Sequence, residues 1–181
     1  MPVDMKQTIA ETLAGLLEQK KIEKITVKEL VDACHISRQT FYYHFQDIME
    51  VVEYLMRQHL QQALEVSLAA PSPREAVKAM LTAGDREEAL LRHLLSSQRR
   101  EEVIGLLLRF TRAYFAEMLH ARAAHVTFSA ADVELAIHFY SCGIVGVLLD
   151  GLGKKRDPDI LADQIVRLFA GELLGAPERP D

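Results

Sequence analysis

The residues of this chain whose types and spacing could do chemistry lie between Ser37 and Phe45. Phe41 and Phe45 are four residues apart, so on a helix they share one face and the other positions point away from it. The outward set combines a forked guanidinium, an amide, a hydroxyl and aromatic rings without a carboxylate; its members are Arg38, Gln39, Thr40, Tyr42, Tyr43 and His44. Such groups suit the base edges and phosphates of a DNA major groove, so the pattern indicates binding rather than catalysis.

A helix-turn-helix would position these groups. Thr26 followed by Glu29 forms a capping box that starts a first helix near Val27, and Ser37 caps a second helix that ends at about Phe45. The first helix has a narrow apolar side, made of Val27, Leu30, Val31 and Cys34. The alternative is an ordinary two-helix corner with a polar surface, which is common in all-α proteins.

The end of the second helix, Tyr42-Tyr43-His44-Phe45, favours the first interpretation. From Ile9 to Asp47 the chain resembles the N-terminal DNA-binding domain of the TetR/AcrR family of bacterial transcriptional regulators, whose recognition helix typically ends in Tyr-x-His-Phe. With the outward pattern, the resemblance implies these DNA-binding residues: Thr26, Lys28, Ser37, Arg38, Gln39, Thr40, Tyr42, Tyr43 and His44. The stretch from Ser37 to Tyr42 is also similar to family members linked with dihydroxyacetone kinase control.

Two positions depart from the family pattern. The corner between the helices usually carries glycine, because a residue there needs a positive φ, and this chain has His35. Histidine tolerates that conformation better than a branched residue does. The family also commonly has a lysine near the start of the next helix, where it meets a DNA phosphate, and Ile48 stands there instead. That phosphate contact is left open.

Composition indicates a well-packed chain with an unusual charge for a DNA-binding protein. Of its 181 residues, 49% are apolar, which is ample for a buried core. The formal net charge is −5, and residues 1–47 carry six Lys or Arg against seven Asp or Glu. DNA binding must therefore depend on the local placement of cations, for which the candidates are Lys20, Lys21, Lys24 and Lys28.

Cysteine usage and hydropathy predict a cytoplasmic location. Cys34 and Cys142 have neither metal-site nor disulfide spacing, so we expect no metal and a reducing interior. We also expect no cofactor. Met1 to Ala10 does not have the pattern of a secretory leader, and the longest apolar runs, such as Ile144–Leu149, are far too short to span a bilayer. We expect no membrane association.

Apolar periodicity and caps predict about nine helices and no strand, hence an all-α fold. The expected ranges are 4–20, 27–34, 38–45, 47–69, 73–83, 86–97, 101–123, 130–149 and 157–174. Residues 1–47 form a helix-turn-helix DNA-binding domain, and 48–181 form a ligand-sensing and dimerisation domain. Gly84-Asp85 should end one helix and cap the next, and Ser96-Ser97-Gln98 is either a joint or a kink. The tail from Gly175 should be frayed.

The last two helices suggest a partner. The helix at 130–149 is apolar nearly all round, so it should be buried on several sides, with Gly143 and Gly146 allowing close approach. In the TetR-like architecture the last two helices of each subunit form a four-helix dimer interface. The alternative is that the two glycines pack inside one subunit.

The family resemblance also implies a cavity in the body that takes a small molecule and changes the separation of the two DNA-binding heads. Its candidate lining residues, each of which could equally be plain core, are Phe110, Tyr114, Met118, His138, Phe139 and Cys142. Catalytic motifs such as Gly-x-Ser-x-Gly or a phosphate-binding glycine loop are not found, so we predict no enzyme.

The leading hypothesis is a homodimeric, ligand-responsive regulator, most often a repressor in this family. It would bind a palindromic operator in double-stranded DNA and respond to a small-molecule effector. A co-regulator acting mainly through another protein is the alternative, motivated by the acidic head, His35 and Ile48. An all-α enzyme is the third and least favoured hypothesis.

Overall fold

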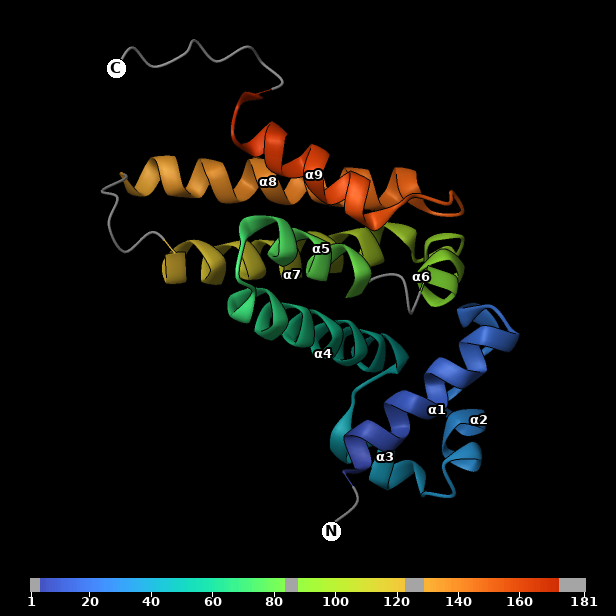
Figure 1. Ribbon diagram of the computed structural model, residues 1–181. Helices are drawn as coiled ribbons and strands as arrows, with labels where there is room; N and C mark the ends of the chain where they lie inside the picture. Colours follow the sequence, from blue (N-terminus) through green and yellow to red (C-terminus); the bar gives the residue numbers. More distant parts are fainter. Residues whose placement is uncertain (1–3, 84–87, 123–128, 173–181) are drawn as a thin grey trace, which may run out of the picture.

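The computed structural model describes residues 4–83, 88–122 and 129–172, and all regular structure within these ranges is helical (Figure 1). The predicted all-α fold is confirmed. The elements are α1 (Met5–Gln19), the 3-10 turn η1 (Ile22–Lys24), α2 (Val27–Ala33), α3 (Arg38–His44), α4 (Ile48–Ala69), α5 (Pro73–Ala83), α6 (Glu88–Leu95), α7 (Arg100–Arg122), α8 (Ala130–Gly151) and α9 (Pro158–Phe169).

Helices begin where a side chain accepts a hydrogen bond from an otherwise unpaired backbone N–H of the first turn. The side chains that do so are Asp4, Thr26, Ser37, Asp47, Ser72, Ser129 and Asp157. The capping-box prediction holds only in part, because the Glu29 carboxylate binds Lys20 instead of returning to Thr26. Caps therefore set the helix starts. The carboxylate of Glu29, which was expected to complete the capping box, instead connects α2 to Lys20 at the end of α1.

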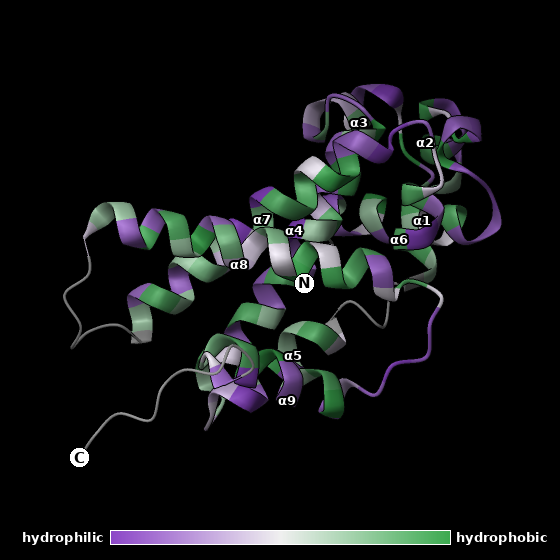
Figure 2. Cartoon of the chain, turned by 90° about the horizontal axis from the view of Figure 1, so that it is seen from above, coloured by the Kyte–Doolittle hydropathy of each residue, from purple (hydrophilic) through white to green (hydrophobic). Residues whose placement is uncertain are grey.

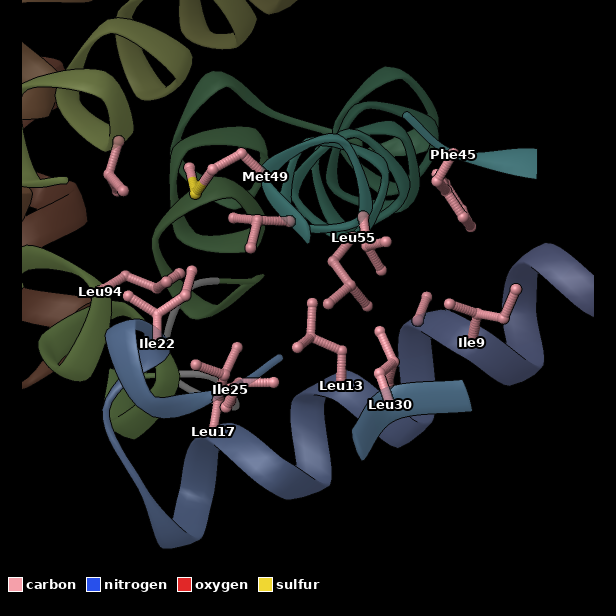
Figure 3. Packing of buried hydrophobic residues seen from close by; sticks show 14 of the residues in the cluster. Ile9, Leu13, Leu17, Ile22, Ile25, Leu30, Phe45, Met49, Leu55 and Leu94 are labelled. Atoms are coloured by element: carbon pink, nitrogen blue, oxygen red, sulfur yellow. The ribbon is translucent and has the colours of Figure 1, made fainter. Parts of the chain in front are cut away.

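The head is formed by α1, η1, α2 and α3. Ile9, Leu13 and Leu17 on α1 and Leu30 on α2 are fully buried (Figure 3). Phe41 on α3 is fully buried as well. The same buried cluster continues past residue 47 into α4 and into the body, through Met49, Val51, Val52, Leu55, Leu94, Leu95, Val103 and Leu106. The hydrophobic core of the head is thus shared with α4, α6 and α7.

The body is a stack of helices in which α4 packs on α5 and α7, α7 packs on α8, and α5 packs on α9. In Figure 1 the pair α8 and α9 lies on the side of the body away from the head. A second buried cluster binds these layers, with Met80 and Leu81 from α5, Tyr114 and Phe115 from α7, and further residues Ile144, Ala162 and Ile165 from α8 and α9. The body thus has its own core, between the middle and outer layers.

The expectation that the 130–149 helix is buried on several sides is wrong for the single chain. Within α8, which the structure describes throughout, the buried residues are Ser141, Ile144 and Val145. Gly143 and Gly146 have open space where a side chain would be, so the interpretation that they pack inside one subunit is also contradicted. Apolar periodicity shows that a helix needs a partner but not which surface supplies it.

By length and composition alone, α8 would also be apolar enough to cross a membrane. The expectation that no stretch reaches that length rests on uninterrupted apolar runs and does not hold for the whole helix. The core helices of water-soluble proteins pass the same test, so this is weak evidence for a membrane.

Two further helix boundaries can be compared with the expectation: the end of α9 and the segment between α6 and α7. The last helix ends at Phe169 instead of Leu174, and Gly171 follows with a positive φ of 78°, as is common just past a helix end. The segment Ser96-Ser97-Gln98 is a true joint, because α6 ends at Leu95 and α7 begins at Arg100. The stop and cap predicted at Gly84-Asp85 and the tail from Gly175 lie outside the described residues.

Candidate nucleic-acid interface and body cavity

The outward face of α3 is built by its cap and its two buried rings. The Ser37 hydroxyl accepts the N–H of Thr40, and Phe41 and Phe45 are buried, which fixes the rotation of the helix. Tyr42 and Tyr43 then point outward and are 57% and 84% exposed, respectively. Large aromatic side chains are costly to leave in water, so two adjacent ones on a short helix indicate a surface that binds something.

The other predicted DNA-contacting residues gather around this helix. Arg38 and Gln39 are exposed on its first turn, and Lys28 is exposed on α2. His44 is half-buried, with its ring packed edge-on against Tyr43 at 5.0 Å between centroids. The hydroxyl of Thr40 lies 2.8 Å from that of Ser37, so both belong to the cap.

Thr26 and Ser37 also leave backbone N–H groups of their helices near the surface. Each hydroxyl caps one amide of its own first turn, at 3.2 Å from Glu29 N and 3.0 Å from Thr40 N. The remaining free amides at a helix start attract anions, because the helix dipole is positive at that end. Their position suits phosphate oxygens beside a groove.

The corner between α2 and α3 is made by His35, whose φ is 55°. The chain reverses through two backbone hydrogen bonds, from His35 N to Asp32 O at 3.2 Å and from Ile36 N to Val31 O at 3.0 Å. The predicted left-handed residue is therefore confirmed. Ile48, at the first turn of α4, is half-buried and packs against the head core, so it offers apolar contact where a lysine would offer charge.

Ion pairs limit the cations available to DNA. Lys20 is bound to Glu29, and the ammonium of Lys6 lies 5.5 Å from the centre of the Phe45 ring. Lys24, Lys28 and Arg38 are exposed, and no ion pair to them is found within the described ranges. The positive charge near α3 is thus local and small.

A cavity of about 190 Å³ lies in the body, between α4, α5, α6, α7, α8 and the turn before α9. Most of its wall is leucine and methionine, and the polar groups are few: His59, Thr111, Tyr114, Lys154 and Arg156. Among the described residues that line it, none is a carboxylate. Apolar walls with a few placed polar groups are the usual composition of a small-molecule site.

The structure brings only part of the predicted ligand set to this cavity. Phe110 and Tyr114 line it, while Met118 packs in the second buried cluster nearby. His138, Phe139 and Cys142 do not line it, because they lie on the exposed side of α8. There Arg112 donates to the His138 ring at 2.9 Å.

Sequence reasoning missed Lys154 and Arg156. The basic turn that holds them is exposed, yet these two side chains also form part of the cavity wall. Both are bound to Asp150, which Lys154 meets at 2.8 Å. The sequence signal that could have found them is their spacing. Lys154 and Arg156 lie on either side of Lys155 and follow Asp150 by four and six residues.

Helix α6 lies between this cavity and the head. Leu90, Leu91 and Leu94 line the cavity, and His93 donates from Nδ1 to the carbonyl of Leu17 at 2.6 Å. Because a carbonyl can only accept, Nδ1 must carry the proton. Just beyond α6, the N–H of Gln98 donates to a carboxylate oxygen of Glu23 at 2.7 Å. This hydrogen bond holds the pKa of Glu23 below its usual value.

Two family models match the chain. Residues 9–55 match the model described as bacterial regulatory proteins, tetR family, and residues 72–171 match the model described as transcriptional regulator C-terminal region. No curated protein matches the sequence.

Several solved structures share the fold. The dihydroxyacetone kinase operon activator DhaS has a TM-score of 0.71 at 13% identity, covering 97% of this chain and 99% of its own. A tetR-family transcriptional regulator from Streptomyces coelicolor has a TM-score of 0.65 at 16% identity, covering 93% and 82%. The TetR family repressor AlkX from Dietzia sp. strain DQ12-45-1b, implicated in biodegradation of n-alkanes, has 0.61 at 16%, covering 97% and 98%.

Proposed function

This chain belongs to the TetR family of bacterial transcriptional regulators, and we propose that it acts as a homodimeric repressor that binds a palindromic DNA operator and is released by a small molecule. The observation that carries the proposal is the exposed, carboxylate-free face of α3, with Tyr42 and Tyr43 standing out from it. We place its action in the cytoplasm, where the DNA is, and assign it no catalytic role.

Each head would insert α3 into a major groove. The Arg38 guanidinium, on the first turn, can make a forked contact to a guanine, and Gln39 can pair with an adenine edge. The tyrosine hydroxyls, the amides at the starts of α2 and α3, and Lys28 would meet phosphates and fix the register. We keep the nine residues predicted from the sequence as one interface, in which Thr40 and His44 stand on the same helix as these groups.

Two heads are needed because one offers few contacts. The outer surface of α8 and α9 supports a dimer, since large apolar residues stand exposed there: Leu135, Phe139, Ile160 and Leu168. Pairing with a second copy would bury this surface and hold two recognition helices at a fixed separation. The apolar character of α8 is then explained by a protein partner of the same sequence.

The proposal also includes whether the protein represses or activates transcription. DhaS is described as an operon activator and AlkX as a repressor, and both have this fold. We favour repression by occupancy of the operator, released when a molecule enters the body cavity. A co-regulator that acts through another protein is the second candidate, favoured by the apolar Ile48 and by the net negative head.

Selection of binding sites from a random duplex pool tests the function directly. The wild-type protein should enrich a palindrome, and Arg38→Ala should weaken binding to it by about 1–3 kcal/mol while relaxing the base preference at one position per half-site. Tyr42→Phe should weaken binding more evenly across sequences. Lys155→Ala is the control, because Lys155 is an exposed cation in the body.

Failure to enrich any sequence, with wild-type protein that is folded and dimeric, would contradict operator binding and favour the co-regulator. Equal affinities of wild type, Arg38→Ala and Tyr42→Phe at matched salt would instead show that another face contacts DNA.

A further inference from the structure

We propose that the body cavity selects a small apolar molecule that carries one anionic group, and that Lys154 and Arg156 bind that group. The inference rests on the proposed ligand response and names the chemical class of its effector. Three observations carry it: the size of the cavity, the charges on its wall, and the anchoring of those charges from outside.

The size limits the apolar part. An engineered cavity of about 150 Å³ lined by aliphatic and aromatic side chains stays dry and binds benzene. At about 190 Å³ this cavity is of the same order, and its wall is mostly leucine and methionine. By this comparison it accommodates a benzene-sized ring or a short alkyl chain.

The charges on the wall set the sign of the polar part. Lys154 and Arg156 come from the turn between α8 and α9, beside Gly151, Leu152 and Pro158, which also line the cavity. They therefore form one stretch of wall. Because none of the described lining residues is a carboxylate, a cation would find no opposite charge there, whereas an anion would find two.

Asp150 holds both cations from outside without filling the cavity. Its two carboxylate oxygens bind Lys154 and Arg156, one each, and Asp150 does not line the cavity. Over the whole turn, three cations, Lys154, Lys155 and Arg156, stand against the carboxylates of Asp150 and Asp157, which leaves a net charge of +1 at this end. The pair is thus held in place and still one negative charge short, so an incoming anion completes the balance without displacing Asp150.

The position of this turn ties the ligand to the outer layer. The turn joins α8 to α9, and the guanidinium of Arg156 lies about 3.8 Å from the place where a side chain on Gly151 would begin. An anion bound here therefore contacts the end of α8 as well as the start of α9. The two helices of the proposed dimer surface would be fixed at the point where the ligand is held.

The test compares three probes of equal chain length on the full-length protein: sodium octanoate, 1-octanol and octylamine, each titrated calorimetrically below its aggregation concentration. Octanoate should bind more tightly than octanol, and octylamine should bind most weakly. Lys154→Met and Arg156→Met keep the aliphatic stems, and each should weaken octanoate about tenfold or more while changing octanol less than twofold. Lys155→Met is the matched control, since it removes a neighbouring cation that does not line the cavity.

The inference is overturned if the three probes bind alike, if none binds at millimolar concentration, or if Lys155→Met weakens octanoate as much as Lys154→Met does. The wild-type probe series decides between anion and cation preference even if a variant fails to fold, which circular dichroism would reveal.

DNA affinity is measured separately on the selected palindrome. Octanoate preference without any effect on DNA affinity would support the anion site and count against ligand-controlled repression. Equal binding of the three probes, together with a fall in DNA affinity when they bind, would overturn the anion site and support ligand-controlled repression.

Discussion

A left-handed histidine makes the corner of the helix-turn-helix. His35 has φ of 55°, where a Cβ atom crowds the following carbonyl and costs roughly 1–2 kcal/mol in an ordinary L-residue. The side chain is exposed, so packing does not compensate for that cost. The residue is nonetheless better suited to the position than a branched one, because histidine is enriched in this region of backbone space.

We therefore predict that His35→Gly raises the free energy of unfolding by up to about 1 kcal/mol, and that His35→Val lowers it by about 1–2 kcal/mol. The expected gain is limited, because glycine also increases the entropy of the unfolded chain. Urea denaturation of both variants against wild type measures this. A more stable valine variant would mean that the corner is not strained.

The residues of α3 illustrate what sequence alone can position. Ser37, Phe41 and Phe45 fix the start and rotation of a helix by hydrogen bonding and burial, so the exposed Tyr42 and Tyr43 follow from spacing. Lys154 and Arg156 do not follow in this way, because a residue in a turn can be exposed and still line a cavity. That placement depends on how α8 and α9 pack, which no local pattern contains.

At the scale of elements, α8 carries an apolar surface that the chain itself leaves open. Leu135 and Phe139 are 67% and 66% exposed, and Gly146 has room beside it. Phe139→Glu and Gly146→Glu should each convert the proposed dimer into a soluble monomer, because a charge would be buried without a partner at the proposed interface. Operator affinity should fall steeply with the loss of the second head. Analytical ultracentrifugation at micromolar concentration measures the assembly.

The matched control is Val66→Glu on α4, since Val66 is 59% exposed and lies on neither α8 nor α9. It should remain dimeric. A wild-type protein that sediments as a monomer while keeping full operator affinity would refute the dimer model.

Helices α5 and α9 are joined by a charged cluster. Arg74 donates to Asp163 at 2.6 Å and to Asp159 at 2.8 Å, and Lys78 meets Asp159 at 2.9 Å. Hydrogen bonds from Lys78 and then Arg74 lower the pKa of Asp159 below its ordinary value of 3.8. The same contacts raise the pKa of Arg74, chiefly through Asp163.

Since the pKa of Asp159 is lowered by folding, its stabilising contribution is present above pH 3.8 and is lost as the pH falls through the lower folded value. Arg74→Met should therefore lower the melting temperature at neutral pH, and the difference from wild type should narrow below about pH 3.8. Arg99→Met, which removes a pair with Glu102 within one local segment, is the control and should change little. A difference that widens in acid would contradict this assignment.

The helices themselves were largely predictable, and their partners were not. Caps at Thr26, Ser37, Asp47, Ser129 and Asp157 mark the starts of five helices, because these hydrogen bonds are local. The faces of α8 were not assigned correctly, since a helix that is apolar nearly all round does not reveal which side meets its own chain. For that reason His138, Phe139 and Cys142 were expected at the cavity and lie outside it.

At the scale of the whole molecule, a net charge of −5 sets how the protein can hold DNA. Few cations stand near α3 without an ion pair among the described residues, so a dimer should neutralise roughly 4–6 phosphates, and the slope of log affinity against log salt should be about −4 to −5, at ~0.9 per phosphate. Non-specific binding should be correspondingly weak.

Operator and random-sequence binding at several salt concentrations gives this slope, with Lys28→Gln expected to make it shallower by about one unit per head. Lys155→Gln should leave it unchanged. A slope near −10 would mean that a larger basic surface faces the DNA than α3 and its neighbours supply.

The joint between head and body limits how this regulator could be recombined with others. Ile22 and Ile25 of the head lie against Leu94 of α6 (Figure 3) and are buried in one cluster with it and Leu95. His93 and Gln98 donate hydrogen bonds back to Leu17 and Glu23. A chimera cut at residue 47 would expose those isoleucines and leave both acceptors without these donors. Figure 2 shows α1 and α6 side by side, where this contact is made. The portable unit is the head together with the start of α4, α6 and the start of α7, so sensor swapping must graft across the joint.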